Sequence, residues 1–434
     1  MEGLIGFSVF IVALLVFLAT GTPVAVATGL LGILGVYLFL PPAAIAQLGN
    51  IALSQSANFV LVVVPLFVMM GEALAATTIG RDLFTAAQIW LRRLPGALAV
   101  GTILACSCFA AVCGSSPVTA ATIGSMAVPQ MIAKGYDPKL ALGVTAAGGT
   151  LGILIPPSIP MILYGVITET SIGSLFMAGI VPGILMALML SATVMLLVWR
   201  NPAIAPRAAE ATAARERWRS LSSVIPVMIL ALAVLGSIYT GIATPTEAGS
   251  VGALGAIIIA AVLGALSRAT MQRILGNTVR TTAMFILLIV GGLFSAFVLA
   301  RLGIPQATAR LLVGLDVPPW VIMVLINLLL MVLGMFMDPM SLLVIVVPVF
   351  FPAVVALGYD PVWFGVVITI NIEIAAISPP VGFNLFVLKT VIPGAEMRDI
   401  IRGSLVFIVP LALGIGLLIL WPEIALWLPR LMMN

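Results

Sequence analysis

The stretch GTLGILIPPSIPMILYG, residues 149–165, places two adjacent prolines, Pro156-Pro157, inside a long apolar run. A second pair, Pro379-Pro380, follows 223 residues later (379 − 156) in NIEIAAISPPVGFNLFV, residues 371–387. The tetrapeptide GYDP recurs at the same separation, at 135–138 and 358–361. Further matches at 223 or 222 residues are Pro129 with Pro352, Gly80 with Gly303, and Thr22-Pro23 with Thr244-Pro245. This constant spacing predicts that the chain is built from two repeated halves.

The composition restricts the kind of protein that contains this repeat. Of the 434 residues, 62% are hydrophobic and only 8% are charged, against roughly 25% in soluble domains. So few charges cannot cover a soluble surface, which excludes a secreted mini-protein, a nucleic-acid binder and a disordered chain. The chain has no histidine, which excludes zinc or haem ligation by histidine and Ser-His catalysis. We expect an all-α polytopic membrane protein, with about 20 apolar residues per span.

Apolar runs define the expected crossings of the bilayer. The ten net crossings are 4–19, 23–40, 59–79, 139–168, 172–199, 222–240, 244–266, 283–301, 362–390 and 400–421. Two other segments, 96–134 and 318–357, each have two apolar arms about a polar break. We interpret both as re-entrant helical hairpins, and the alternative is a pair of ordinary spans in each. The N-terminal segment has no basic residues before its apolar run, so we expect an uncleaved first span.

The distribution of basic residues orients the chain. With the N-terminus outside, all but three of the 19 basic residues lie on the inner side, as the positive-inside rule requires; the exceptions are Arg301, Arg310 and Arg430. Both termini are then periplasmic. We divide the chain into a first repeat over 1–200, a cytoplasmic linker over 201–221 and a second repeat over 222–434. Five crossings per half, an odd number, invert the second repeat, which is the plan of secondary transporters.

Polar and amphipathic segments flank the predicted spans. Arg81 to Arg93 and Arg268 to Arg280 alternate basic and apolar residues, so we expect helices that lie at the inner interface, and 47–58 is a third such segment on the outside. The three cysteines, Cys106, Cys108 and Cys113, share one apolar stretch. Small buried thiols explain them better than a metal or redox site.

Four segments combine polar atoms with glycine or proline inside apolar sequence: 113–119, 148–158, 334–341 and 371–384. A proline lacks an N–H group and opens the helix, which frees carbonyl oxygens. These oxygens and neighbouring hydroxyls suit Na⁺, while the helix N-termini beyond the breaks present N–H groups to an anion. The alternative is that the glycines and prolines only allow helices to pack closely.

Four acidic residues fall within the apolar sequence. Asp338 precedes Pro339, so it either caps the next helix, coordinates an ion or has a proton-linked role. Glu247 follows Thr244-Pro245 and is expected to start a helix. Glu72 is expected to contact another subunit or an amphipathic arm. Glu373, one turn before the second break, is the better candidate for ion coupling.

These residues resemble the large membrane subunit (DctM type) of tripartite ATP-independent periplasmic (TRAP) transporters. The similarity rests on the two Pro-Pro stretches quoted above, on GMFMDP at 334–339 and on GYDP at 358–361. It covers nearly the whole chain, from TGTPVAVA at 20–27 to the last span.

The resemblance implies a Na⁺-driven permease of the bacterial inner membrane that imports an organic acid, such as a C4-dicarboxylate or a sialic acid-like compound. It implies an elevator mechanism, a small four-span membrane subunit and a periplasmic substrate-binding protein as partners, and no cofactor or transition metal. The implied ion-binding residues are Ser115, Ser116, Gly149, Thr150, Gly334, Asp338, Ser378, Pro379 and Gly382. The implied substrate-binding residues are Ser116, Thr119, Pro156, Pro157, Pro380 and Asn384.

Other functions compete with this interpretation. The first alternative is a stand-alone anion/cation symporter of similar architecture that works without a binding protein. An enzyme is disfavoured because Ser115 and Ser116 have no histidine base and the nearest lysines are expected at the inner face. A channel would not need broken helices in an inverted pair.

Overall fold

The computed structural model describes residues 2–206 and 214–433. Over these residues the chain is entirely helical apart from turns, which confirms the all-α prediction. The helices of the first half are α1 (Glu2–Ala19), α2 (Val24–Phe39), α3 (Ile45–Ser56), α4 (Val63–Ala75), α5 (Ile79–Leu91), α6 (Ala97–Cys113), α7 (Ser116–Ala133), α8 (Pro138–Thr150), α9 (Ile159–Thr168) and α10 (Ile172–Arg200). Short 3₁₀ helices lie at Pro42–Ala44, Phe59–Val62, Leu151–Ile153 and Pro202–Ile204.

The second half follows a similar order of helices. Its members are α11 (Ala214–Tyr239), α12 (Pro245–Val262), α13 (Arg268–Arg301), α14 (Ile304–Val313), α15 (Pro319–Gly334), α16 (Pro339–Ala356), α17 (Pro361–Ala376), α18 (Phe383–Val391), α19 (Met397–Leu420) and α20 (Glu423–Met433). It differs in that the long helix α13 stands where the first half has α3 and α4, and in that α20 is added at the end. Most starts recur at the spacing seen in the sequence; α8 begins at Pro138 and α17 at Pro361, for example. The relative orientation of the two halves stays a prediction.

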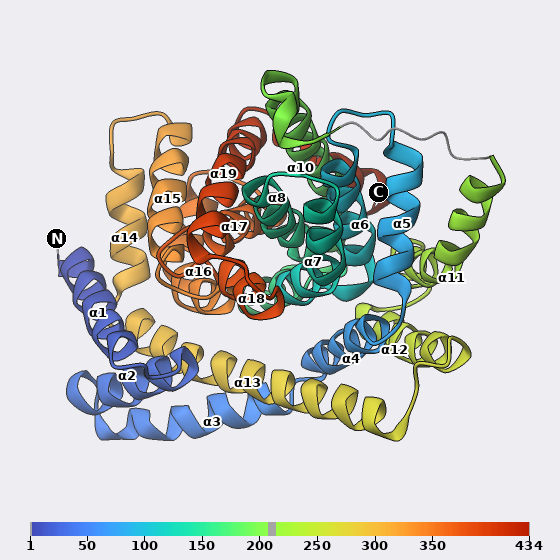
Figure 1. Ribbon diagram of the computed structural model, residues 1–434. Helices are drawn as coiled ribbons and strands as arrows, with labels where there is room; N and C mark the ends of the chain where they lie inside the picture. The colour runs from blue at the N-terminus through green and yellow to red at the C-terminus, as the bar shows by residue number, and fades with distance from the viewer. Residues whose placement is uncertain (1, 207–213, 434) are drawn as a thin grey trace.

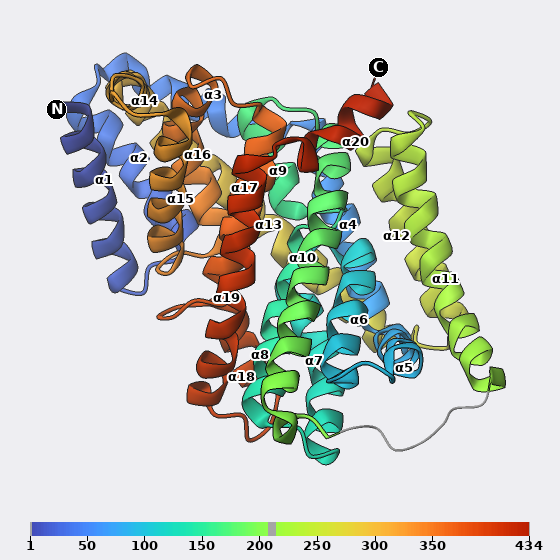
Figure 2. The ribbon, with the colours of Figure 1, turned by 90° about the horizontal axis from the view of Figure 1, so that it is seen from above.

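Two groups of helices are distinguished by their packing. We call α1–α4 and α11–α13 the outer frame, in which α13 packs along α2 and α4, and α12 packs on α4. We call α6–α10 and α15–α20 the central bundle. Figure 1 shows α13 running beneath the bundle, with α1 and α11 on opposite sides. Figure 2 shows α10 and α19 running side by side through the bundle, with α5 between α6 and α11. The short helices α5 and α14 link the groups, since α5 packs on α6 and α11 and α14 packs on α16 and α1.

The breaks expected from the sequence occur where the prolines predict them. The segment 96–134 forms α6 and α7, which meet at Gly114 with φ of 66°. The segment 318–357 forms α15 and α16. The segments 139–168 and 362–390 each form two helices separated by the Pro-Pro pair, whose peptide bond is cis in both. Six described helices are long and apolar enough to span a membrane, or seven if the pair bent by 48° about Ala57-Asn58 is one span. The re-entrant nature of the hairpins stays a prediction.

Two expected boundaries are wrong. The amphipathic segment 268–280 and the predicted span 283–301 form the single 34-residue helix α13. No proline interrupts the intervening residues, and Ile274 and Thr278 are buried on one side of the helix while its arginines are exposed, so the backbone hydrogen bonds continue through the polar part. The last eight residues of the predicted linker 201–221 belong to α11, because Ala214 onward favours helix. Residues 207–213 lie outside the described residues.

Candidate functional site

A cavity of about 470 Å³ separates the outer frame from the helix starts of the central bundle. The bundle side is formed mainly by the first residues of α7, α9, α16 and α18, and the frame side by α2, α4 and α13. Two carboxylates, Glu72 and Asp338, lie in the wall among mostly apolar side chains. The lining residues include no lysine or arginine. An anion bound here would therefore lack a basic side chain to neutralise it.

The starts of α7 and α18 meet at this cavity. The Ser116 hydroxyl and the Asn384 amide oxygen are 2.9 Å apart, and the Asn384 amide nitrogen donates to the Ala146 carbonyl at 3.2 Å. Both side chains are buried. The residues before the two helices, Ser115 and Gly382, make no side-chain cap. The N–H groups of both first turns are therefore left uncapped by side chains at the edge of the cavity.

The starts of α9 and α16, which are the repeat counterparts of α18 and α7, are capped. Ser158 accepts from the Met161 N–H at 3.3 Å, and its own hydroxyl donates to the Ile153 carbonyl. Asp338 accepts from the N–H groups of Met340 at 3.2 Å and Ser341 at 3.3 Å, and from the Ser341 hydroxyl. The cap predicted for Asp338 is confirmed, while its ion and proton roles stay predictions.

The structure brings the first group of predicted ion-binding residues together. Gly152 lies so close to the start of α7 that a Cβ atom added to it would be 2.7 Å from both the Ser115 carbonyl and the Thr119 hydroxyl. A Cβ atom added to Gly149 would be 2.6 Å from Ala120. Thr150 is buried, and its hydroxyl donates to the Ala147 carbonyl at 2.7 Å. The end of α8 therefore lies directly against the start of α7.

The second group is also brought together. The Val381 N–H donates to the Met335 carbonyl at 3.2 Å, which ties the second break to the tip of the α15–α16 hairpin. Gly334 packs against Ala375, and Gly382 has φ of 46°, a conformation that favours glycine. The Ser378 hydroxyl donates to the Ile374 carbonyl at 2.6 Å.

The predicted substrate residues divide between the cavity wall and the interior. Ser116 and Asn384 line the cavity, as do Ser115 and Asp338 from the ion-binding set. Thr119, Pro156, Pro157 and Pro380 do not line it. The Pro157 carbonyl lies 2.8 Å from the position of a Cβ atom added to Gly114. The first break therefore packs against the tip of the α6–α7 hairpin.

Sequence reasoning missed the frame side of the cavity. Pro23–Ala25, Val68 and Thr281–Leu288 contribute to this wall although none lies in the four polar segments. The one sequence feature that pointed to this wall was the acidic residue Glu72 within a predicted span. Its carboxylate accepts a hydrogen bond of 2.8 Å from the Asn277 amide, so of the two expected partners, another subunit or an amphipathic arm, the structure shows a residue of the amphipathic segment 268–280.

The remaining two acids differ sharply in environment. Glu247 forms a capping box with Thr244 at the start of α12, as predicted. Glu373 is fully buried in α17, and neither of its carboxylate oxygens has a hydrogen-bond partner. Its neighbour Asn371 differs, because that amide donates to the Asn327 side chain of α15 and to the Val367 carbonyl at 3.1 Å.

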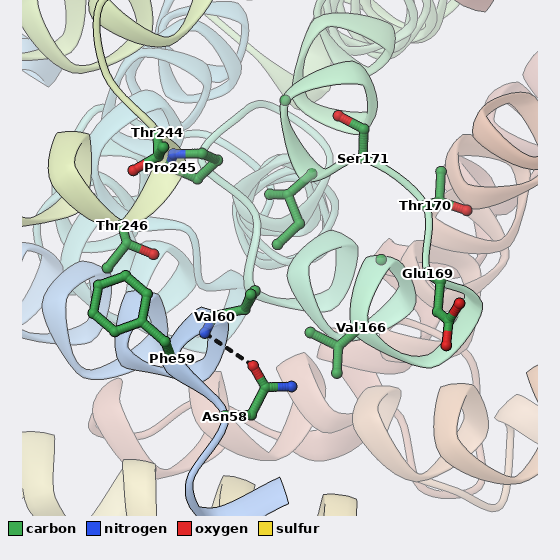
Figure 3. A pocket seen from close by; sticks show the side chains of 13 residues that line it. Asn58, Phe59, Val60, Val166, Glu169, Thr170, Ser171, Thr244, Pro245 and Thr246 are labelled. Carbon is green, nitrogen blue, oxygen red and sulfur yellow. Dashed lines mark hydrogen bonds between the residues drawn. The ribbon is translucent and has the colours of Figure 1, made fainter. Parts of the chain in front are cut away.

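A second cavity of about 490 Å³ lies where three turns expected on the outer side converge. Figure 3 shows Asn58, Ser171 and Thr244 around it, with Glu169 at one edge. The three polar residues each cap a helix start: Asn58 accepts from the Val60 N–H at 3.0 Å, Ser171 from Ser174 at 3.3 Å and Thr244 from Glu247 at 3.3 Å. These side chains already accept hydrogen bonds from the backbone N–H groups of helix starts.

Comparisons with known proteins agree with these features. Residues 11–424 match the family described as the DctM component of the tripartite ATP-independent periplasmic transporter. The chain is 35% identical over 405 residues to the C4-dicarboxylate TRAP transporter large permease protein DctM of Pseudomonas aeruginosa, covering 93% of each chain. It is 33% identical over 379 residues to the sialic acid TRAP transporter large permease protein SiaM of Vibrio cholerae, covering 87% of this chain and 88% of SiaM. Its fold is similar to the crystal structure of the Alcanivorax borkumensis YdaH transporter, with a TM-score of 0.65, 20% identity and coverage of 99% and 100%.

Proposed function

The chain belongs to the DctM component family of tripartite ATP-independent periplasmic transporters, and we propose that it imports an organic acid together with Na⁺. It is a transporter permease with many membrane-spanning helices. The proposal concerns what it carries, which ion drives it, and how it moves.

The observation that carries the proposal is the chemistry of the cavity between frame and bundle. Two uncapped helix starts, those of α7 and α18, present N–H groups and the positive ends of their dipoles to an anion. The wall also holds the carboxylates of Glu72 and Asp338 and no basic side chain. An organic anion between them is repelled unless cations enter with it. A monovalent cation that enters with the anion offsets the repulsion by the two carboxylates, while the helix starts remain available to bind the anion.

We assign the Na⁺ sites to the two groups of residues that the fold brings together. The first is Ser115 and Ser116 with Gly149 and Thr150, where the end of α8 lies against the start of α7. The second is the Gly334–Asp338 tip with Ser378, Pro379 and Gly382. Each group supplies backbone carbonyls and hydroxyls, which are hard oxygen ligands suited to a small monovalent cation.

The substrate carboxylate is assigned to Ser116 and Asn384, with Thr119, Pro156, Pro157 and Pro380 shaping the backbone behind them. Relatives are named for C4-dicarboxylate, sialic acid, ectoine and 2,3-diketo-L-gulonate. Because these compounds differ in size and in substituents, we propose only an organic acid as the substrate class.

The proposed movement is an elevator, in which the central bundle slides against the outer frame. Supporting this, the bundle contains both hairpins and both breaks, while α5 and α14 are the short helices that link it to the frame. In the predicted orientation Pro23 and Thr281 lie toward the cytoplasmic ends of their helices, so the cavity faces the cytoplasm. Both termini are then periplasmic.

The proposed partners are a small four-span membrane subunit and a periplasmic substrate-binding protein. A relative of Oleidesulfovibrio alaskensis named isethionate TRAP transporter permease protein DctMQ is matched over only 59% of its own length. That protein therefore contains a further segment beyond the region shared with this chain. We propose that the small subunit of the present system is a separate chain.

Reconstitution in liposomes tests the function. The chain with both partners should take up a labelled organic acid, chosen by a ligand screen on the binding protein, only under an inward Na⁺ gradient. Uptake that persists without Na⁺ contradicts the coupling. Uptake without the binding protein favours the stand-alone symporter instead.

A further inference from the structure

The carboxylate of Glu373 is the least compensated polar group of the described chain. It is fully buried in α17, and no donor reaches either oxygen. Ala376, one turn further along the same helix, lines the cavity that we assign to the substrate. Glu373 therefore lies one helical turn behind the cavity wall, in the part of the molecule proposed to move.

The charged and titratable groups of the surrounding helices do not compensate it. The helices packed against α17 are α8, α9, α10, α15, α16, α18, α19 and α20. Their titratable residues are Lys139, Tyr164, Arg200, Lys389, Arg398, Asp399, Arg402, Glu423 and Arg430, and those at their ends are Asp137, Glu169, Asp338, Tyr359, Asp360 and Glu396.

These groups are engaged elsewhere or exposed. The Tyr164 hydroxyl donates to the Pro361 carbonyl at 2.6 Å, at the far end of α17, and Lys389 donates to the Ala395 carbonyl at 2.7 Å. Glu423 pairs with Arg430. Asp137, Asp338 and Asp360 cap helices, and Tyr359 stacks on Trp363. Asp399 lies in the first turn of α19 and is partly buried, and Glu169 is exposed. The remaining side chains, those of Lys139, Arg200, Glu396, Arg398 and Arg402, are exposed.

An ionised carboxylate in this position would be desolvated without a partner, which is among the costliest arrangements in a protein interior. The neutral carboxylic acid avoids this cost. Acids inside membrane helices commonly belong to ion or proton pathways for this reason. The geometry thus favours a group that crosses the membrane as the acid and ionises only when water reaches it.

We propose that Glu373 carries one proton with the substrate in each transport cycle. The proton is taken from external water and forms an O–H bond with the Glu373 carboxylate while the bundle faces outward. In the structure, whose cavity faces the cytoplasm in the predicted orientation, Glu373 is still buried. The bond breaks when water from this cavity reaches the carboxylate behind Ala376, and the proton passes to internal water. This inference rests on the proposed symport function and adds a second coupling ion to Na⁺.

Proteoliposomes that contain the permease, its partners and an internal pH dye test the inference. In the wild type, substrate addition under an inward Na⁺ gradient should acidify the lumen. An external pH lower by one unit should raise steady-state accumulation by up to about tenfold, because one co-transported proton adds one factor of the proton ratio. Robust Na⁺-driven uptake with no substrate-dependent acidification overturns the proton role. No uptake at all contradicts the proposed function instead.

The variant Glu373→Gln keeps the size of the side chain and mimics the protonated acid. We expect it to exchange internal for external substrate at a rate within about twofold of wild type while losing both lumen acidification and the effect of external pH. Glu423→Gln, an exposed carboxylate on α20, is the matched control and should retain proton movement. Persistent acidification in Glu373→Gln, or loss of exchange in a variant whose melting curve is unchanged, refutes the proposal. A Glu373→Gln variant that transports fewer Na⁺ ions per substrate but still moves protons also refutes the proposal.

Discussion

The four helix starts at the breaks of the central bundle differ in how they are capped, and each half of the chain has one start of each kind. At α7 and α18 the preceding residues, Ser115 and Gly382, make no side-chain cap, and both helix starts line the cavity. At α9 and α16, whose first residues also line the cavity, Ser158 and Asp338 accept hydrogen bonds from the first-turn N–H groups. A repeat that gives four similar helix ends thus leaves only one pair with free donors.

The difference has an electrostatic consequence. A helix start binds anions through N–H groups that nothing else occupies, so a capped start is a weak anion site. Asp338 goes further, since its own charge opposes a second anion beside α16. We therefore place the substrate carboxylate at the uncapped pair and expect variants of the two pairs to behave differently.

The largest effect is expected from filling the uncapped pair. Ser116→Leu removes the contact with Asn384 and places an apolar side chain where the carboxylate would bind, so uptake should fall by about 100-fold or more, as when a binding site is blocked. Uptake in liposomes and a thermal melt measure this. Ser125→Leu, on an exposed position of the same helix, is the control. Normal uptake by a folded Ser116→Leu protein would sink the site assignment.

Converting the uncapped pair into a capped one should have the next largest effect. Ser115→Asp places at the start of α7 the residue type that caps α16. We expect the folded state to gain about 1 kcal/mol from the new cap, while substrate affinity falls by about tenfold or more because the carboxylate occupies the donors. Equilibrium binding and melting of the same sample separate the two effects. A variant that is more stable and binds equally well contradicts the assignment.

The sequence located the breaks but not the difference between the pairs. Pro156-Pro157 and Pro379-Pro380 predicted where helices end because a proline cannot continue the hydrogen-bond ladder. Ser115 and Ser158, in contrast, are both serines at helix starts, and only Ser158 caps. The Ser158 hydroxyl also donates to the carbonyl of Ile153, five residues earlier in the same break, and this backbone arrangement could not be inferred from the serine alone.

Long-range packing also explains what was missed around the cavity. Thr281–Leu288 of α13 is far in sequence from the four polar segments, yet it forms part of the wall. The polar surface of 268–280 resembled a separate interfacial helix, although one of its polar residues, Asn277, faces inward to Glu72. Hydrophobic periodicity identifies which side of a helix is buried, but not which polar residue binds a distant partner.

A smaller effect is expected at the charged cap of the second pair. Asp338→Asn keeps part of the cap but removes the charge, so the free energy of unfolding should fall by at most about 1 kcal/mol. If the carboxylate also coordinates Na⁺, the Na⁺ concentration for half-maximal uptake should rise by about tenfold. Uptake measured over a Na⁺ series tests this, with Glu247→Gln, another capping acid, as control. An unchanged Na⁺ dependence assigns Asp338 to capping alone.

The smallest effect is expected at Ser158, where the comparison predicts a change in stability without a change in transport. Ser158→Ala removes the bond to the Met161 N–H and leaves the buried Ile153 carbonyl without its hydroxyl donor, so unfolding should become easier by about 1 to 2 kcal/mol. Because the Ser158 side chain does not line the cavity, which α9 reaches only through Ile159, substrate affinity should stay within about twofold. Thermal melting and substrate binding, measured on the same preparation, test this prediction. A large loss of affinity at unchanged stability would mean that the capped start also contacts substrate, and the distinction between the two pairs would then be wrong.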